Sequence, residues 1–304
     1  MSGPLFISSG DLIADRRYDF ARGYAAAGDL SAAADLYAQA VERAPHFASA
    51  WFALGETREA LGDVDGARAA FEQARAADPQ DRHGAALHLA RLTGAPAPTE
   101  ALHIYVRTLF DQYAPRFDRA LADLSYAAPA LLRDAITRQA TRFGAMLDLG
   151  CGTGLAGAAF RPHVDWLVGV DLSPRMIEEA RRKGLYDRLH VADIQSFLAA
   201  QRAEGAAFHL VIAADVLAYV ADLPAVCAAV AAVLASGGLF GFTVETHEGE
   251  GAIVGAKMRY AHSAGFVRSA LAQAGLTLVA LTQASSRTEN RAPVPGLLVV
   301  ARRG

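Results

Sequence analysis

The pattern of apolar and polar positions changes near the middle of the chain. In residues 14–81, alanines and single aromatic residues recur with the spacing of paired helices joined by short turns. Beyond Gly144, short apolar runs rich in Val, Leu and Ile alternate with amphipathic segments. The pattern therefore predicts an all-helical region followed by an α/β region.

The helical region contains an internal repeat. Gly28 and Gly62 are 34 residues apart, and the same spacing separates Tyr37 from Phe71. A 34-residue period of helix, turn and helix is typical of tetratricopeptide repeats. We assign two repeats and a capping helix, at 14–47, 48–81 and 82–94.

Two repeats are few for a stable stack, since such repeats bury their core against neighbours. We therefore expect them to pack on the rest of the protein or on another chain. Two roles remain open, a peptide-binding surface and a packing or dimerisation module. A linker over 94–100 separates this all-α module (1–95) from a second domain (96–304), whose helical lid is predicted at 100–140.

The second region has the pattern of a parallel sheet wound with helices. Helices are predicted at 173–183, with Ser173 as N-cap, and at 263–275. Such strand–helix units form a doubly wound sheet with its ligand at the carboxyl ends of the strands. Strands are predicted at 145–149, 165–172, 189–193, 208–215 and 238–245, with a closing hairpin at 276–283 and 296–302.

The first strand leads into a glycine-rich loop, "LDLGCGTGLAG", at 147–157. Three of its glycines fit the dinucleotide-binding fingerprint, with Asp171 near the distance expected for a ribose contact. Asp148, however, would face the pyrophosphate of a dinucleotide and repel it. Asp148, Asp171 and Asp193 together favour a cationic cofactor over an anionic one.

These motifs resemble those of class I S-adenosylmethionine-dependent methyltransferases. "LDLGCGTG" is similar to the first motif of that family, Asp171 and Asp193 match its second and third acidic motifs, and "LVIAADVLAYVADL" resembles its fourth. The resemblance covers residues 140–303. It implies a Rossmann-like seven-stranded sheet, S-adenosylmethionine as cofactor and S-adenosylhomocysteine as product.

The resemblance also implies roles for single residues. In that family the glycine loop admits the methionine part of the cofactor to the backbone. The residues matching Asp171, Met176 and Asp193 hold the ribose hydroxyls, pack on the adenine and bind its amino group. The implied cofactor site consists of Tyr113, Phe117, Asp148, Gly150, Cys151, Gly152, Thr153, Gly154, Asp171, Leu172, Met176, Ala192, Asp193, Ile194, Ala214 and Asp215.

Residues 109–132 resemble the helical lid of a narrower subgroup, in which tetratricopeptide repeats precede the methyltransferase. That subgroup is likened to trans-aconitate methyltransferase, and it shares an "RYAHS" stretch, here 259–263. An aromatic side chain covers the cofactor in such lids. This makes Tyr113 and Phe117 the candidates for that contact.

The acceptor site is expected among the loops after the fourth and fifth strands and in the final hairpin. "ADVLAY" stands where nucleic-acid and glutamine amino-methyltransferases carry an Asn/Asp-Pro-Pro-Tyr/Phe element, which argues against those acceptors. No residue is assigned as a catalytic base. The polar candidates are Tyr219, Glu245, His247, Arg259, Tyr260, His262, Arg287 and Arg291.

Positive charge in these loops predicts an anionic acceptor. Arg259 and His262 precede a helix, and Arg291 approaches from the hairpin on the opposite side, so the three are expected to bind a carboxylate or phosphate. The alternative is that Arg259 pairs with Glu245 or Glu248 and only orders its loop.

Composition narrows the functional classes. The 304 residues carry a net charge of -3, which argues against a general nucleic-acid binder. Cys151 and Cys227 form neither a disulfide framework nor a metal-ligand pattern, and no metal is expected. The uncharged stretch 223–244 is interrupted by Ser-Gly-Gly, so we expect a helix and a buried strand there instead of a membrane span. Residues 1–17 do not have the pattern of a signal peptide, and a soluble cytoplasmic protein is predicted.

Two functional hypotheses follow. The first is a methyltransferase acting on a small anionic molecule or on a protein-borne group presented with the help of the repeats. The second is a repeat-based scaffold with a vestigial cofactor domain. The complete set of glycine and acidic positions favours the first hypothesis.

Overall fold

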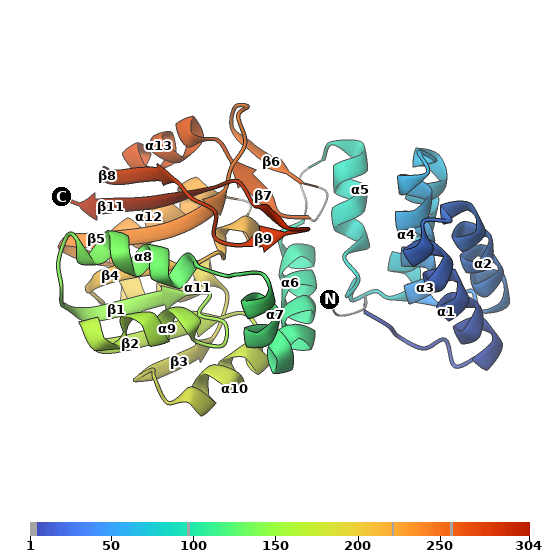
Figure 1. Cartoon of the computed structure of the whole chain (residues 1–304), viewed down its shortest axis with the longest axis horizontal. Helices are drawn as coiled ribbons and strands as arrows, with labels where there is room; N and C mark the ends of the chain where they lie inside the picture. The colour runs from blue at the N-terminus through green and yellow to red at the C-terminus, as the bar shows by residue number, and fades with distance from the viewer. Residues whose placement is uncertain (1–4, 96–97, 221, 256–257) are drawn as a thin grey trace. The chain divides into compact units, whose positions relative to one another are not determined.

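The computed structural model describes residues 5–95, 98–220, 222–255 and 258–304 (Figure 1). The chain divides into two compact units, Met1–Leu109 and Phe110–Gly304. The division falls inside helix α6 (Thr99–Tyr113), whereas the sequence predicted a boundary at 95/96. One continuous helix therefore belongs to both units. Two residues of the expected linker, 96–97, lie outside the described residues.

The first unit consists of helical hairpins at the positions that the repeat predicts. Gly28 and Gly62 adopt φ values of 88° and 83°, which only glycine tolerates well, and each turns the chain between the helices of a pair. Asp29 and Asp63 then cap the second helix of each pair with their side chains. The helices are α1 (Leu12–Ala27), α2 (Leu30–Arg43), α3 (Ala48–Ala60), α4 (Val64–Ala77) and α5 (Ala85–Thr93).

The sheet of the second unit has a main path of seven strands in the order β3-β2-β1-β4-β5-β11-β8. The first five are parallel, whereas β11 runs antiparallel to both β5 and β8. This confirms the predicted fold class and the closing hairpin. The strands are β1 (Phe143–Leu149), β2 (Val164–Asp171), β3 (Arg188–Val191), β4 (Phe208–Ala213), β5 (Leu234–Glu245), β8 (Leu276–Gln283) and β11 (Gly296–Arg303).

The described sheet is larger than the expected seven strands. Two short strands, β6 (Ala252–Val254) and β7 (Tyr260–His262), bring it to nine by pairing with each other and with the end of β5. A separate ribbon forms from β9 (Thr288–Glu289) and β10 (Ala292–Pro293). Runs of two or three residues are too short for a periodic pattern, so the sequence did not indicate these strands.

Helices cover both faces of the sheet. Side chains alternate along β1, so Leu147 and Leu149 join one buried cluster with α12 and α13, whereas Met146 joins another with α8 and α9. The arrangement is the doubly wound one, and it brings the loops after β1, β2, β4 and β5 to one edge. These helices are α8 (Ala128–Thr137), α9 (Leu155–Phe160), α10 (Pro174–Lys183), α11 (Ile194–Ala203), α12 (Leu223–Val233) and α13 (Ala264–Gln273).

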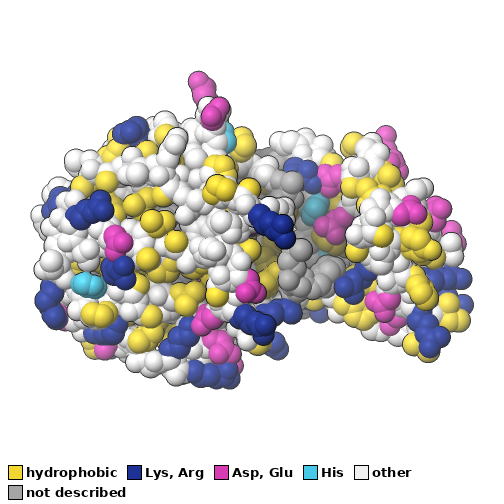
Figure 2. All heavy atoms as spheres, in the orientation of Figure 1, with side chains coloured by type: hydrophobic (Ala, Val, Ile, Leu, Met, Phe, Trp, Pro, Cys, Tyr) yellow, Lys and Arg dark blue, Asp and Glu magenta, His cyan; other side chains and the backbone are white. Residues whose placement is uncertain are grey.

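The predicted lid is helical. The last residues of α6, the short η1 (Ala114–Arg116) and α7 (Phe117–Asp123) lead into α8. The uncharged stretch 223–244 forms α12 and most of β5, as expected. Within the described ranges, no helix has the length and apolar character needed to cross a membrane. On the face shown in Figure 2, Lys and Arg side chains lie scattered among Asp and Glu and do not form a continuous basic track.

Candidate functional site

The glycine loop after β1 depends on backbone geometry that other residues rarely adopt. Gly150, Gly152 and Gly154 have φ values of 63°, 53° and 92°. A Cβ at Gly150 would lie 2.1 Å from the side chain of Val216, so this position has no room for one. The glycines therefore let the loop turn sharply where β1 ends.

Asp171, at the end of β2, holds the loop in place. Its Oδ2 accepts a hydrogen bond from the Gly152 amide at 2.9 Å, and its Oδ1 accepts one from the Ser173 amide at 2.8 Å. Burial raises the pKa of Asp171 to about 6, although both amide hydrogen bonds act in the opposite direction. The carboxylate thus links the first two motifs.

Asp148 lies on β1 beneath the loop and is 1% exposed. The hydroxyl of Tyr186 donates a hydrogen bond to Asp148 Oδ2 at 2.7 Å, whereas the buried Oδ1 has no hydrogen-bond partner among the described residues. Burial raises the pKa of Asp148 to about 7, and the charge of Asp171 adds to this shift while the Tyr186 hydrogen bond opposes it. An orphaned carboxylate oxygen of this kind suits a ligand with a cationic N–H group.

The other predicted cofactor residues are placed by the same strand ends. Asp193 caps α11 by accepting hydrogen bonds from Gln195 and Ser196 amides, each at 3.0 Å. Met176 is fully buried on the inner face of α10. Cys151 and Thr153 are buried within the loop. Partly exposed positions follow β2, β3 and β4 at Leu172, Ala192, Ile194, Ala214 and Asp215.

The lid contacts the glycine loop directly. The ring of Phe117 lies 3.5 Å from the position that a Cβ of Gly152 would occupy. Asp118 accepts a hydrogen bond from the hydroxyl of Thr153 and pairs with Lys183 at 2.6 Å. Phe117 therefore packs on the glycine loop, and its role as the aromatic that covers the cofactor stays a prediction.

The second lid candidate makes a different contact. The ring of Tyr113 lies under the guanidinium of Arg116, 5.5 Å from its centroid, within the lid itself. Another lid residue, Asp111, accepts a hydrogen bond from the hydroxyl of Ser173 at 2.5 Å and so reaches the start of α10. The lid is thus attached both to the glycine loop and to the loop after β2.

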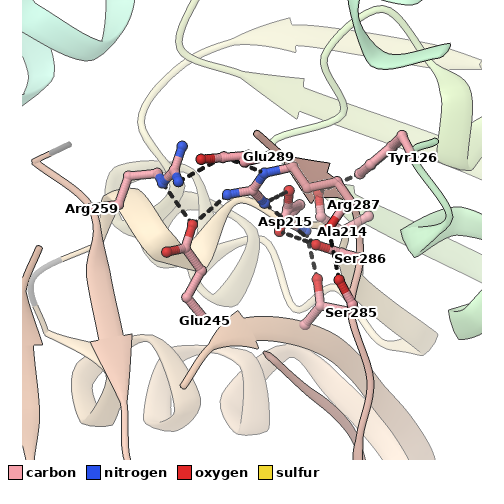
Figure 3. A network of polar contacts seen from close by, with 10 residues as sticks. Tyr126, Ala214, Asp215, Glu245, Arg259, Ser285, Ser286, Arg287 and Glu289 are labelled. Carbon is pink, nitrogen blue, oxygen red and sulfur yellow. Dashed lines mark hydrogen bonds and ion pairs between the residues drawn. The ribbon is translucent and has the colours of Figure 1, made fainter. Parts of the chain in front are cut away.

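Three of the polar residues expected near the acceptor, Glu245, Arg259 and Arg287, form a network of ion pairs with Asp215 and Glu289 (Figure 3). Arg287 is 6% exposed and pairs with Asp215, Glu245 and Glu289. Arg259 pairs with Glu245 at 2.6 Å and with Glu289 at 2.8 Å. The network joins the loop after β4, the last residue of β5, the residue before β7, and β9 with the residue before it.

The surroundings of Arg259, His262 and Arg291 give no support to the predicted anion site, which stays a prediction. Arg259 already has carboxylate partners, which is the alternative that the sequence left open, with Glu245 and not Glu248 as a partner. His262 is fully buried and stacks on Phe266, and burial lowers its pKa to about 4. Arg291 is exposed on a turn with φ 64°.

Two tyrosines and a cavity complete this end of the sheet. Tyr219 meets the ring of Phe110 edge-on at 5.2 Å, and burial raises its pKa, while the nearby Arg259 guanidinium lowers it. Tyr260 is half-buried. The cavity has a volume of about 310 Å³ and is lined by Glu245, Gly255, Arg259, Glu289, Ala292, Pro293, Val294 and Pro295.

The sequence patterns did not identify several side chains that hold this site together. Asp111, Asp118 and Lys183 connect the lid to the loop, and Tyr186 binds Asp148. None belongs to a recognisable motif, and their partners lie 30 or more residues away in the sequence. Asp111 and Asp118 are two of several charged residues in the lid, so no signal in the sequence singled them out.

Two family profiles match the chain, one in each region. A methyltransferase domain matches residues 147–240, and a tetratricopeptide repeat matches residues 18–82. The first match covers the glycine loop and Asp148, Asp171 and Asp193. The second covers both predicted repeats apart from their outermost residues at the N-terminal end.

Two curated relatives match one region each. Human Methyltransferase-like protein 27 is 39% identical over 105 residues, which is 33% of this chain and 41% of that protein. The TPR repeat-containing protein PA0015 of Pseudomonas aeruginosa is 42% identical over 57 residues, which is 19% of this chain and 54% of that protein. The chain thus spans only about half the length of these relatives or less.

A solved structure shares the fold. Burkholderia thailandensis 1,6-didemethyltoxoflavin-N1-methyltransferase, with bound 1,6-didemethyltoxoflavin and S-adenosylhomocysteine, aligns with a TM-score of 0.52 and 22% identity. The alignment covers 69% of this chain and 93% of that one. The α/β unit therefore has the fold of S-adenosylmethionine-dependent methyltransferases.

Proposed function

We propose that this chain, which joins a methyltransferase domain to tetratricopeptide repeats, binds S-adenosylmethionine and transfers its methyl group to an acceptor. The observation that carries the proposal is the state of Asp148. Asp148 is 1% exposed, and one of its carboxylate oxygens has no hydrogen-bond partner among the described residues. The adjacent Asp171 is also an acid, and its charge raises the pKa of Asp148 further. A cofactor that carries an ammonium and a sulfonium has a net positive charge despite its own carboxylate and suits an acidic site, whereas a dinucleotide adds negative charge.

The residues around Asp148 fit the rest of this cofactor. Gly150, Gly152 and Gly154 follow the carboxyl end of β1 with positive φ and carry no side chain, so their backbone could lie close to the methionine part of the cofactor. Asp171 would bind the ribose hydroxyls, and Asp193 would bind the adenine amino group from the cap of α11. Phe117 of α7, whose ring packs on the loop, would cover the cofactor and exclude water.

The cofactor supplies a methyl group on a sulfonium, which is already an excellent leaving group. The protein therefore contributes chiefly by orienting the acceptor and keeping water out. A general base is needed only for an acceptor that loses a proton on methylation, and no residue is assigned to that role. Because Arg259 and Arg287 have carboxylate partners, the proposal does not require a negatively charged acceptor.

The acceptor is a small molecule or a group on a protein that the repeats help to present. Cys151 and Cys227 are both buried free thiols, which suits a reducing compartment such as the cytoplasm. The competing scaffold function differs in one measurable property, since a vestigial domain has no affinity for the cofactor.

Titration calorimetry tests the proposal. We expect S-adenosylmethionine and S-adenosylhomocysteine to bind the full chain, and NADH to bind more weakly than either. Asp171→Ala should weaken S-adenosylmethionine binding by about 1.5–3 kcal/mol, the range for a hydrogen bond to a charged group. Asp134→Ala is the matched control, since the side chain of Asp134 is 57% exposed on α8 and pairs with the neighbouring Arg133. Absence of binding by both cofactor forms would favour the scaffold.

A further inference from the structure

Tyr186 lies between α10 and β3, outside every motif that the proposed function uses. Its ring occupies a slot made by three glycines from different elements. A Cβ at Gly154 would lie 3.0 Å from the ring, one at Gly157 would lie 2.4 Å from it, and one at Gly169 would lie 2.8 Å from it. The last glycine of the loop motif and the glycine of β2 thus make room for this tyrosine.

The slot directs the Tyr186 hydroxyl to Asp148. The hydroxyl donates to Asp148 Oδ2 at 2.7 Å, so this oxygen is bound within the protein. Oδ1 is the buried oxygen with no partner among the described residues. Burial, together with the adjacent Asp148, raises the pKa of Tyr186 well above its usual value, so the tyrosine keeps its proton and remains the donor.

We propose that Tyr186 is a positioning residue, which fixes the Asp148 carboxylate so that Oδ1 is presented to the cationic amine of the cofactor. The inference rests on the proposed function, because it assigns this oxygen to S-adenosylmethionine. Without the hydroxyl, the carboxylate can rotate and both of its oxygens are buried without a fixed donor. Tyr186 thereby controls cofactor affinity without contacting the reacting atoms.

The pH dependence of this site involves few groups. Asp171 faces Asp148 from β2 and raises its pKa, and Tyr186 lowers it through the hydrogen bond. Cys151 and Tyr126 also interact electrostatically with Asp148, but burial raises the pKa of each well above its usual range, so both stay neutral near pH 7. Loss of the Tyr186 hydroxyl should therefore move the titration of Asp148 to higher pH.

Tyr186→Phe keeps the ring in the glycine slot and removes only the hydroxyl. We expect S-adenosylmethionine binding at pH 7.5 to weaken about 5- to 10-fold, the loss of one charge-assisted hydrogen bond. In an Asp148→Asn background the same change should alter affinity by less than about 2-fold, since the two residues act as a pair. Tyr37→Phe, which removes a buried hydroxyl from the repeats, is the control and should bind as the unaltered chain does.

A second variant displaces the Tyr186 ring and keeps its hydroxyl group. Gly157→Ala places a Cβ 2.4 Å from the Tyr186 hydroxyl and ring, so it should reproduce the loss seen in Tyr186→Phe. Gly265→Ala is the matched control, because a Cβ there meets nothing within 4 Å. The proposal would be overturned if Tyr186→Phe weakened S-adenosylmethionine binding equally in the unaltered chain and in the Asp148→Asn background. It would also be overturned if neither Tyr186→Phe nor Gly157→Ala weakened that binding.

A measurement without cofactor separates this inference from the proposed function. Carboxyl-carbon NMR of the full chain should show Asp148 titrating near pH 7, and about one pH unit higher in Tyr186→Phe. An unchanged titration refutes the positioning role, even where S-adenosylmethionine binds. Conversely, a shifted titration in a chain that binds neither cofactor form would retain the hydrogen-bond assignment and reject the methyltransferase.

Discussion

Arg287 offers a direct test of how much the ion network contributes to the sheet unit. Its side chain is 6% exposed and its guanidinium meets three carboxylates. Removing one partner from a buried ion pair costs about 3–5 kcal/mol, because the other partner keeps its charge without compensation. Arg259 still pairs with Glu245 and Glu289 after the change, so Asp215 loses most. We therefore expect Arg287→Met to cost about 3 kcal/mol, at the lower end of this range.

The two tryptophans make the measurement specific. Trp51 lies on α3 and Trp166 on β2, so a Trp51→Phe background leaves one fluorophore, in the sheet unit. Urea unfolding in that background should show a midpoint lower by about 1.5 M for Arg287→Met, with a slope near 2 kcal/mol per M. Adding Asp215→Asn should recover much of the loss, since it removes the uncompensated charge.

Arg182→Met provides the exposed counterpart. Arg182 also pairs with two glutamates, Glu178 and Glu179, but its side chain is 60% exposed. A solvent-exposed pair contributes about 0–1 kcal/mol, so this variant should shift the midpoint little. If Arg182→Met and Arg287→Met unfolded at the same urea concentration, burial would not be the property that makes the Arg287 ion pairs matter for stability.

Further outcomes concern the cofactor site, the lid and the division of the chain. Binding of a cation favours the ionised Asp148, whose pKa burial raises to about 7, so S-adenosylmethionine affinity should fall as pH drops through this value. The expected loss between pH 8 and pH 6 is about tenfold, with proton release on binding that calorimetry in two buffers detects and that Asp148→Asn abolishes. Gly150→Ala should weaken cofactor binding at least about tenfold, because its Cβ meets Val216 at 2.1 Å, whereas Gly184→Ala, with a similar φ of 64° but open space, tests for backbone strain alone. Asp118→Ala frees Thr153 and Lys183 from the lid and should speed tryptic cleavage after Arg116 and Arg119, while the exposed Asp123→Ala should not. Residues 96–304 alone should retain S-adenosylhomocysteine binding, since every proposed cofactor residue lies within them, and failure of that fragment to bind would place part of the site in the repeats.

Local patterns predicted most of the fold. The strands of the main path are apolar runs bounded by turn residues, and the repeat period located the helical hairpins. The features that were not predicted are strands too short to show a periodic pattern and contacts between residues distant in the sequence. β7 consists of three residues, and its addition beside β5 buries His262, which the loop assignment had expected near the acceptor.

The cofactor side of the site was more predictable than the acceptor side. Asp148, Gly152 and Asp171 follow directly from strand ends that the pattern locates. The ion network instead joins Asp215 to Arg287, 72 residues later, through the return of the last strands. The sequence left open whether Arg259 binds an anion or pairs with Glu245, and the fold brings both Glu245 and Glu289 to its guanidinium.

The place of β11 in the sheet has a consequence for how the protein is made. β11 is the last strand in chain order, yet it lies between β5 and β8. During synthesis, β5 and β8 therefore emerge with unpaired edges that stay open until residues 296–303 follow them. The helical hairpins depend mainly on local contacts, so they can begin to form while the sheet is still incomplete. Chaperone demand and aggregation of nascent chains should accordingly be concentrated in the interval before β11 appears.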